Sequence, residues 1–270
     1  GSIEEGNDSH FPPGNHIYPG NNFKYHLLPF EAAFDVGVSS VMPYYGIPVG
    51  ISDKEVGASF DEYIITDLLR DKYNFNGIIC SDWALITDRI LPNGKMFKPA
   101  SAFGLEDKST EERITELLNA GIDMIGGESL TNNLVELIKT GIISEKRIDE
   151  SLKRILKQKF QLGLFDNPYI KLSSLKNLDN KKFINKGIEA QKKSLVLLKN
   201  NDILPIKKDD KIYFEGFGEE LIKKYNYVKS PEKSDYILIK LNSPSGRFEA
   251  KYEMQKMLGG GPLDFTSDII

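Results

Sequence analysis

The hydrophobic positions along the chain alternate between short continuous runs and segments with helical spacing. Continuous apolar runs at residues 38–45, 77–83 and 122–125 predict three buried strands. In other segments apolar residues recur every three or four positions, which predicts amphipathic helices. The predicted helices cover residues 27–37, 61–73, 110–120, 130–140 and 144–162.

The three predicted strands are apolar along nearly their whole length. A strand with one face in water alternates between apolar and polar residues, so these strands must be covered on both faces. The predicted helices can provide that cover, and they indicate an α/β fold with a parallel sheet or barrel. A closed (β/α)8 barrel needs more strands than the three that are evident before residue 165.

Two polar segments interrupt this pattern. Residues 1–25 are rich in Gly, Pro, Asn and Ser, which predicts a long irregular loop, and such loops are usually functional. Residues 166–181 are predicted to be a linker. A second alternation follows, with a helix up to residue 194 and strands at 195–198, 211–217 and 236–241, and this second sheet is not completed by residue 270.

The composition narrows the range of functions. Apolar residues make up 40% of the chain and charged residues 27%, as in an ordinary globular protein. The formal net charge of -4 gives no electrostatic footprint for nucleic acid or an anionic membrane. A single cysteine, Cys80, excludes an intrachain disulfide framework and a cysteine-cluster metal site.

The position of Asp82 in the sequence makes it a candidate catalytic residue. It follows the apolar run at residues 77–80 and a serine, and it precedes Trp83, the only tryptophan. Reactive side chains collect at the carboxyl ends of parallel strands, and an ionised Asp can attack an electrophilic carbon there. The alternative is equally open from spacing alone: Asp82 caps a following helix and Trp83 belongs to the core.

Four segments in a fixed order carry a resemblance to a known family. They are residues 66–83 (TDLLRDKYNFNGIICSDW), 120–124 (AGIDM), 141–165 and 189–205. Together they resemble glycoside hydrolase family 3 over residues 8–215. The family's Lys-His-Phe sugar-binding segment is absent and would precede residue 1, so the resemblance implies a partial chain.

The resemblance implies a fold and a domain arrangement. Residues 1–165 would be the C-terminal part of the catalytic (β/α)8 barrel. Residues 166–181 would link it to the start of an incomplete α/β sandwich domain at 182–270. The implied activity is that of a retaining β-glycosidase, most similar to a β-glucosidase, acting on terminal β-D-glucosyl residues of glucosides or short oligosaccharides. No metal or organic cofactor is implied.

The resemblance also assigns roles to individual residues. Asp82 matches the catalytic nucleophile and Trp83 matches an aromatic residue of the substrate subsite. Met42 and Tyr45 match a strand end that lines the glucose pocket. Without the family, Met42 and Tyr45 are better explained by ordinary core packing.

The general acid/base has two candidates. In the β-glucosidase branch this group is a glutamate of the second domain, and Glu249 is the candidate here, with Glu253 nearby. Neither lies in a motif that aligns with the family, and from the sequence alone either is better explained as a solvated surface carboxylate. The β-N-acetylglucosaminidase branch uses an Asp-x-His dyad, and Asp8 with His10 fits that pattern. His10 is otherwise expected to line the pocket or anchor the loop.

A chain that is catalytically silent by itself is the competing hypothesis. A partial barrel leaves open strand edges, which pair readily with another chain. The partner in that case is another chain or the missing N-terminal half of the barrel. Neither nucleic acid nor a membrane is expected as a partner.

Overall fold

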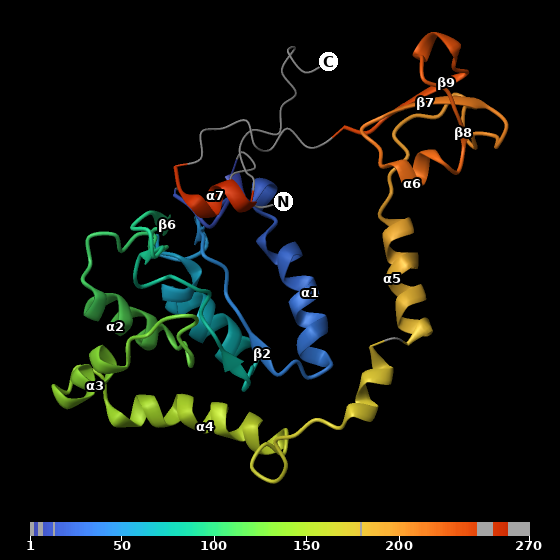
Figure 1. Ribbon diagram of the computed structural model, residues 1–270. Coiled ribbons are helices and arrows are strands. Elements are labelled where there is room, and N and C mark those ends of the chain that lie inside the picture. Colours follow the sequence, from blue (N-terminus) through green and yellow to red (C-terminus); the bar gives the residue numbers. More distant parts are fainter. Residues whose placement is uncertain (1–2, 5–7, 13, 179, 242–250, 259–270) are drawn as a thin grey trace. The chain divides into compact units, whose positions relative to one another are not determined.

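The computed structural model describes residues 3–4, 8–12, 14–178, 180–241 and 251–258 (Figure 1). Its contacts divide the chain into two units. The first comprises Gly1–Pro168 with Pro244–Ile270, and the second comprises Tyr169–Ser243. Within the described residues, no helix has the length and apolar character required to span a bilayer.

Parallel pairing brings the three predicted strands of the first unit together. Strand β2 (Ser40–Val41) pairs with β4 (Ile78–Ile79) in parallel. Beyond β4, Cys80 forms a parallel bridge with Met124. The predicted order and direction are confirmed, but the regular pairing is much shorter than the apolar runs, and the third strand is reduced to this single bridge.

All five predicted helices of the first unit are confirmed. They are α1 (Phe23–Asp35), the π-type helix η4 (Tyr63–Lys72), α2 (Thr110–Ala120), α3 (Thr131–Lys139) and α4 (Glu145–Gln161). Helix α2 begins with a capping box between Ser109 and Glu112 and ends at Gly121, whose φ of 115° suits a residue without a Cβ. The Ser144 side chain caps α4 by accepting a hydrogen bond from the backbone N–H of Arg147.

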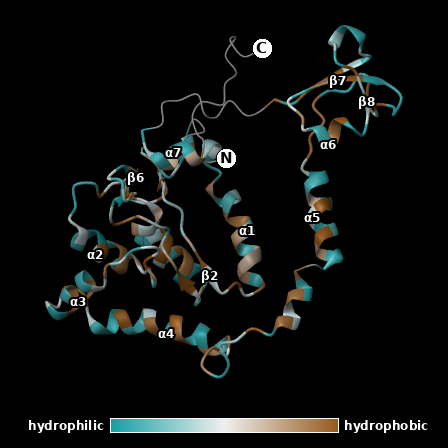
Figure 2. Cartoon of the chain, viewed as in Figure 1, coloured by the Kyte–Doolittle hydropathy of each residue, from teal (hydrophilic) through white to brown (hydrophobic). Residues whose placement is uncertain are grey.

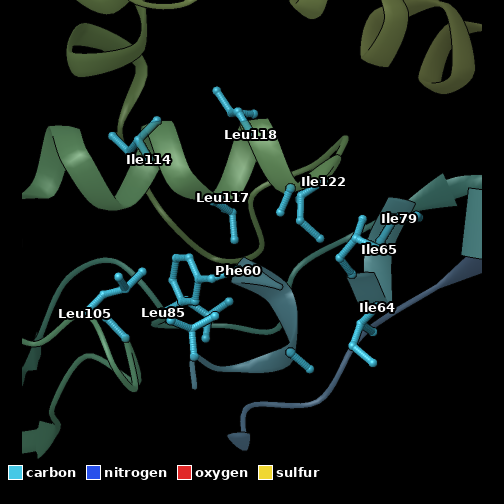
Figure 3. Close-up of a cluster of buried hydrophobic side chains, with 14 of the residues drawn as sticks. Phe60, Ile64, Ile65, Ile79, Leu85, Leu105, Ile114, Leu117, Leu118 and Ile122 are labelled. Carbon is cyan, nitrogen blue, oxygen red and sulfur yellow. The ribbon is translucent and has the colours of Figure 1, made fainter. Parts of the chain in front are cut away.

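The core of the first unit lies between the strands and two of these helices. Ile64 and Ile65 of η4 and Ile114 and Leu117 of α2 are buried in one apolar cluster with Ile79 of β4 (Figure 3). Burial of such side chains provides most of the free energy that holds helices on a sheet. The sheet is therefore fixed from one side by η4 and α2.

Several short elements were not predicted. Strand β1 (Asn15–His16) pairs in parallel with β3 (Ile47–Pro48), and η2 (Pro19–Asn21) follows it. The segment 1–25 is therefore not wholly irregular, which corrects the loop prediction. The remaining ones are η3 (Ala58–Phe60), the antiparallel hairpin of β5 (Arg89–Ile90) with β6 (Met96–Lys98), and α7 (Glu253–Leu258), which contacts β6.

Helix α4 carries an apolar stripe that is only partly covered. The pattern predicts one stripe through Ile148, Leu152, Ile155, Leu156 and Phe160, and Figure 2 shows apolar and polar patches alternating along this helix. Leu152 is 45% exposed and Phe160 is 63% exposed. Within the stripe, Ile148 packs against the core cluster, and Ile155 and Leu156 are half-buried.

The second unit contains a small parallel sheet. Strand β7 (Lys211–Glu215) lies between β8 (Asn226–Tyr227) and β9 (Tyr236–Ile239), and both pair with it in parallel. Its helical elements are η5 (Leu172–Asn177), α5 (Lys181–Lys193), α6 (Glu219–Ile222) and η6 (Pro231–Lys233). The predicted strands at 211–217 and 236–241 and the helix up to residue 194 are confirmed.

The strand predicted at residues 195–198 is wrong. These residues have no regular structure, and Leu195, Val196, Leu197 and Leu198 are 63–93% exposed. A strand needs a neighbouring strand to satisfy its backbone groups, and none of the described strands pairs with this segment. A run of apolar residues is therefore not sufficient for strand formation here.

Candidate active site

The carboxyl ends of the parallel segments meet at one edge of the first unit. The Cys80 backbone N–H donates to the Val41 carbonyl (3.0 Å), and the Ser81 N–H donates to the Met124 carbonyl (2.8 Å). Beyond these bonds the chain leaves the sheet, so Met42 and Asp82 follow neighbouring strands at the same edge. Ligands of open and closed parallel α/β folds bind at this edge.

Asp82 lies in a turn and is half-buried. No helix follows it, and Ala84 has a left-handed φ of 57°. The interpretation of Asp82 as a helix cap is therefore wrong. Its Oδ1 accepts a hydrogen bond from the backbone N–H of Trp83 at 2.7 Å, and Ser81 supports the same turn by donating from Oγ to the Asp82 carbonyl at 2.9 Å.

Tyr45 is buried and forms two hydrogen bonds with the backbone of this turn. Its side chain is 4% exposed, and its hydroxyl donates to the Trp83 carbonyl at 2.6 Å. The Trp83 N–H in turn donates to the Tyr45 hydroxyl at 3.2 Å. Burial, followed by the hydrogen bond and negative charge of Asp82, raises the pKa of Tyr45, so the phenol stays neutral and acts as a donor.

Trp83 provides an exposed aromatic surface beside Asp82. It is 62% exposed, so its assignment to the core is wrong. The indole lies against Gly127, where an added Cβ would fall 2.3 Å from the ring atom Cε3, and against Gly126, where the nearest ring atom would be 2.9 Å away. Gly127 also has a left-handed φ of 61°. The glycines therefore allow the ring to rest on the backbone and keep a flat apolar surface toward solvent.

Met42 differs from Tyr45 in its surroundings. It is 55% exposed at the strand-end edge, so ordinary core packing does not describe it. It also lines an apolar groove with Phe23 and Leu27 of α1 and with Tyr44. Met42 and Trp83 thus expose apolar surface after adjacent strands.

The structure brings the Asp8–His10 pair to the same region. Asp8 Oδ1 lies 2.5 Å from His10 Nδ1 and also accepts the His10 backbone N–H at 2.9 Å. The His10 ring centroid lies 4.8 Å from that of Tyr45. Ser101 anchors this loop by donating its hydroxyl to the His10 carbonyl at 3.0 Å. A histidine in this setting has its Nδ1 oriented by a carboxylate and its Nε2 available.

Two buried charged residues at the site were missed by the sequence analysis. Glu128 is almost fully buried and accepts hydrogen bonds from the backbone N–H of Ile86 (3.1 Å) and from the Thr87 hydroxyl (2.7 Å). Lys98 is 2% exposed, and its Nζ donates to the carbonyls of Trp83 and Ala84. The available signal for Lys98 is a lysine in segment 96–103, whose other residues are all uncharged.

One predicted residue remains outside this geometry. Glu249, the second-domain candidate for the acid/base, lies outside the described residues. In the part of the chain that the structure describes, no group of three or more His, Cys, Asp or Glu side chains is arranged to hold a metal ion.

Comparison with known proteins gives a consistent set of matches. Residues 6–158 match the sequence profile of the glycosyl hydrolase family 3 N-terminal domain. A probable β-glucosidase C of Aspergillus oryzae is 44% identical over 262 residues, which cover 93% of this chain and 41% of that protein. A periplasmic β-glucosidase/β-xylosidase of Dickeya chrysanthemi is 32% identical over 284 residues, covering 99% of this chain and 43% of that protein.

Solved structures show the same likeness. A mutant of an exo-1,3/1,4-β-glucanase from a Pseudoalteromonas species superposes with a TM-score of 0.59 at 29% identity, covering 80% of this chain and 32% of that one. The likeness supports the α/β fold of the first unit. The chain spans about two fifths of the length of the curated relatives it matches.

Proposed function

Because the chain belongs to glycoside hydrolase family 3, we propose that it carries the nucleophile of a retaining β-glycosidase that hydrolyses terminal β-D-glucosyl residues. The observation that carries the proposal is the Asp82 carboxylate at a parallel strand end, beside an exposed tryptophan. The names of the relatives, which include β-glucosidases, support glucosides as the substrate class.

The proposed reaction has two steps. In the first, the Asp82 carboxylate attacks the anomeric carbon, the bond from that carbon to the leaving oxygen breaks, and an acid protonates that oxygen. The product is a glycosyl ester on Asp82. In the second, a water molecule gives its proton to the same group and attacks the anomeric carbon, which releases the sugar and restores the carboxylate.

The surrounding residues have complementary tasks in this proposal. Tyr45 holds the backbone of Trp83 by donating to its carbonyl and accepting from its N–H, which fixes the turn next to the Asp82 carboxylate. The exposed indole of Trp83 and the side chain of Met42 offer apolar surface to the faces of a sugar ring.

The domain assignment is also a proposal. We assign residues 1–165 to the C-terminal part of a (β/α)8 barrel, 166–181 to a linker and 182–270 to the start of an α/β sandwich domain. The contacts divide the chain differently at its end, since residues 244–270 group with the first unit and α7 contacts β6. Among the described strands neither β2 nor the bridge at Met124 pairs with a further strand, which supports an incomplete barrel. The missing strands would come from another part of the native protein or from another chain. Activity should therefore be measured on the native protein and not on this chain alone.

A covalent trapping experiment tests the function. A 2-deoxy-2-fluoro β-glucoside with a good leaving group should inactivate the native protein. The fluorine slows both formation and breakdown of the glycosyl ester, and the good leaving group speeds formation alone, so the ester accumulates. Peptide mass mapping should then locate the label on Asp82. A label on any other residue would contradict the assignment of the nucleophile.

The second catalytic group has two candidates. Glu249 is the first, as a glutamate in the part of the chain assigned to the second domain. The Asp8–His10 pair is the second, and the contact between His10 and Tyr45 favours it. A β-N-acetylglucosaminidase specificity, which such a dyad would otherwise suggest, is not favoured by the names of the relatives.

Replacement of His10 distinguishes the two candidates. If His10 protonates the leaving oxygen, His10→Ala should lower kcat/KM by about 10²-fold or more for a glucoside with a poor leaving group. A dinitrophenyl glucoside needs no protonation, and its cleavage should fall much less. Equal losses for both substrates would exclude His10 as the acid and leave Glu249, whose Glu249→Gln variant would then show the selective loss.

A further inference from the structure

Lys98 is a buried lysine at the end of strand β6, on the hairpin that follows the Asp82 turn. Its Nζ donates to the carbonyl oxygens of Trp83 at 3.2 Å and Ala84 at 3.3 Å. The same nitrogen lies 3.9 Å from the centroid of the Tyr45 ring, within the range of a cation–π interaction. A buried ammonium is costly for stability unless its charge and its donors are satisfied. Packing alone therefore does not explain why a lysine is buried at this position.

The two carbonyls that Lys98 holds belong to a strained turn. Ala84 has a φ of 57°, a region that residues with a Cβ rarely adopt. Such strain persists only where surrounding contacts enforce it. The Ser101 N–H, three residues after β6, also donates to the Ala84 carbonyl at 2.9 Å, so β6 and the segment after it both supply contacts to the turn. Asp82 directly precedes this turn, and its carboxylate accepts a hydrogen bond from the Trp83 N–H within it, so contacts that hold the turn bear on the carboxylate.

Charged groups lie near Lys98 on each of the elements around it. They are Asp82 after β4, Glu128 after the Met124 bridge, Asp8 of the N-terminal segment and Arg89 of β5, with the Tyr45 ring and its neighbour His10 beside them. Glu128 has its own partner in Arg89, and Asp8 has its own in His10. Asp82 forms no ion pair with any residue that the structure describes, and its negative charge acts on the nearby Lys98.

We propose that Lys98 is a positioning residue for nucleophilic attack by Asp82, acting through the Trp83 and Ala84 carbonyls and the face of Tyr45. The inference rests on the proposed function, since it takes Asp82 as the nucleophile. The charged form is the one that holds the turn, because a neutral amine loses the attraction to the aromatic ring and makes weaker hydrogen bonds.

The protonation state of Lys98 gives the proposal a distinctive pH dependence. Burial lowers the pKa of Lys98 to about 8, and the nearby negative charge of Asp82 opposes part of that shift. Activity should therefore fall as the pH rises through about 8. Folding stability should change in the opposite direction, because between about pH 8 and the ordinary lysine pKa the unfolded chain binds more protons than the folded one, and stability then rises with pH. Unfolding cannot account for a loss of activity with this pattern.

Two variants of Lys98 and one control test the proposal in the native protein. Lys98→Met keeps the length of the side chain and removes the charge, and it should lower the rate of labelling by the fluoro-glucoside by about 10²-fold, with little change in KM for an aryl β-glucoside. Lys98→Arg keeps the charge at every accessible pH, so its alkaline limb should move up by more than about one pH unit. Lys108→Met removes an exposed lysine paired with Glu112 and should leave rates and pH profile unchanged.

The outcomes separate this inference from the proposed function. A slow Lys98→Met variant whose label still maps to Asp82, together with a shifted limb in Lys98→Arg, supports the positioning role. A Lys98→Met rate within about twofold of the native rate overturns it, as does an alkaline limb that stays near pH 8 in Lys98→Arg. If Lys98→Met does not fold, the pH profile of Lys98→Arg still decides. A label outside Asp82 in the native protein overturns the proposed function itself.

Discussion

Asp82→Gly is expected to lower kcat for an aryl β-glucoside by on the order of 10⁵-fold, because the variant has no group that can form the glycosyl ester. The turn should survive the change, since the Trp83 N–H retains its hydrogen bond to the Tyr45 hydroxyl when the carboxylate is lost. The loss of activity would then reflect chemistry and not unfolding, which the melting temperature of the variant checks.

Chemical rescue gives a sharper measurement of the same residue. Azide fits the space left by the carboxylate and can attack the anomeric carbon from the same side, forming a carbon–nitrogen bond while the aryl oxide leaves with the electrons of the broken bond. The expected product is an α-glucosyl azide, which NMR distinguishes from its β anomer. A β-azide, or an Asp82→Gly rate within about tenfold of the native rate, would show that another residue is the nucleophile. Asp107→Asn, which changes an exposed acid in the turn before α2, is the matched control.

Helices were more predictable than strands in this chain. A helix satisfies its backbone groups within one segment, so the spacing of apolar residues and a cap such as Ser144 determine it locally. A strand depends on its neighbours. The run at 195–198 is as apolar as the run at 77–80, but only the second has partners on both sides. Short pairs such as β1 with β3 carry too few residues to leave a pattern.

Candidate site residues that directly follow a strand were predictable from the sequence. Residues that reach the site from a distant loop were not. Asp82 and Trp83 are identified by position and by family resemblance. Lys98 is 15 residues from Trp83 and Glu128 is 42 residues from Ile86, the groups that they hold. Sequence spacing carries no information about such contacts, because they depend on the path of the hairpin and on the bridge at Met124.

Asp123 forms the ion-pair network that fixes the sheet edge beneath the site. Its side chain is fully buried, and its carboxylate accepts hydrogen bonds from Arg70 (2.5 Å) and Arg154 (2.8 Å). It also accepts the Ile79 backbone N–H and the Ser151 hydroxyl, each at 2.9 Å. One carboxylate thus joins η4, β4 and α4. Burial lowers the pKa of Arg70, and the charge of Asp123 is what opposes that effect.

Asp123→Asn is accordingly expected to destabilise the first unit by about 3–5 kcal/mol, since it removes the charge while two guanidinium groups stay in place around the amide. Trp83 is the only tryptophan, so its fluorescence during urea unfolding reports on this unit alone. Glu116→Gln removes an exposed pair with Lys54 and should leave the midpoint nearly unchanged.

A double-mutant cycle separates the charge pair from the loss of hydrogen bonds. If the penalty of Asp123→Asn comes from an uncompensated buried charge, then adding Arg70→Met should cost less than it does in the native background, with a coupling of about 1–3 kcal/mol. Arg70 also donates to the Phe75 and Gly77 carbonyls, and the Arg70→Met single variant measures the loss of those bonds. Additive effects would contradict the ion-pair explanation.

The Asp123 network also bears on catalysis. Asp123 binds the backbone of Ile79, three residues before Asp82. A weakened network should therefore lower activity even in molecules that remain folded.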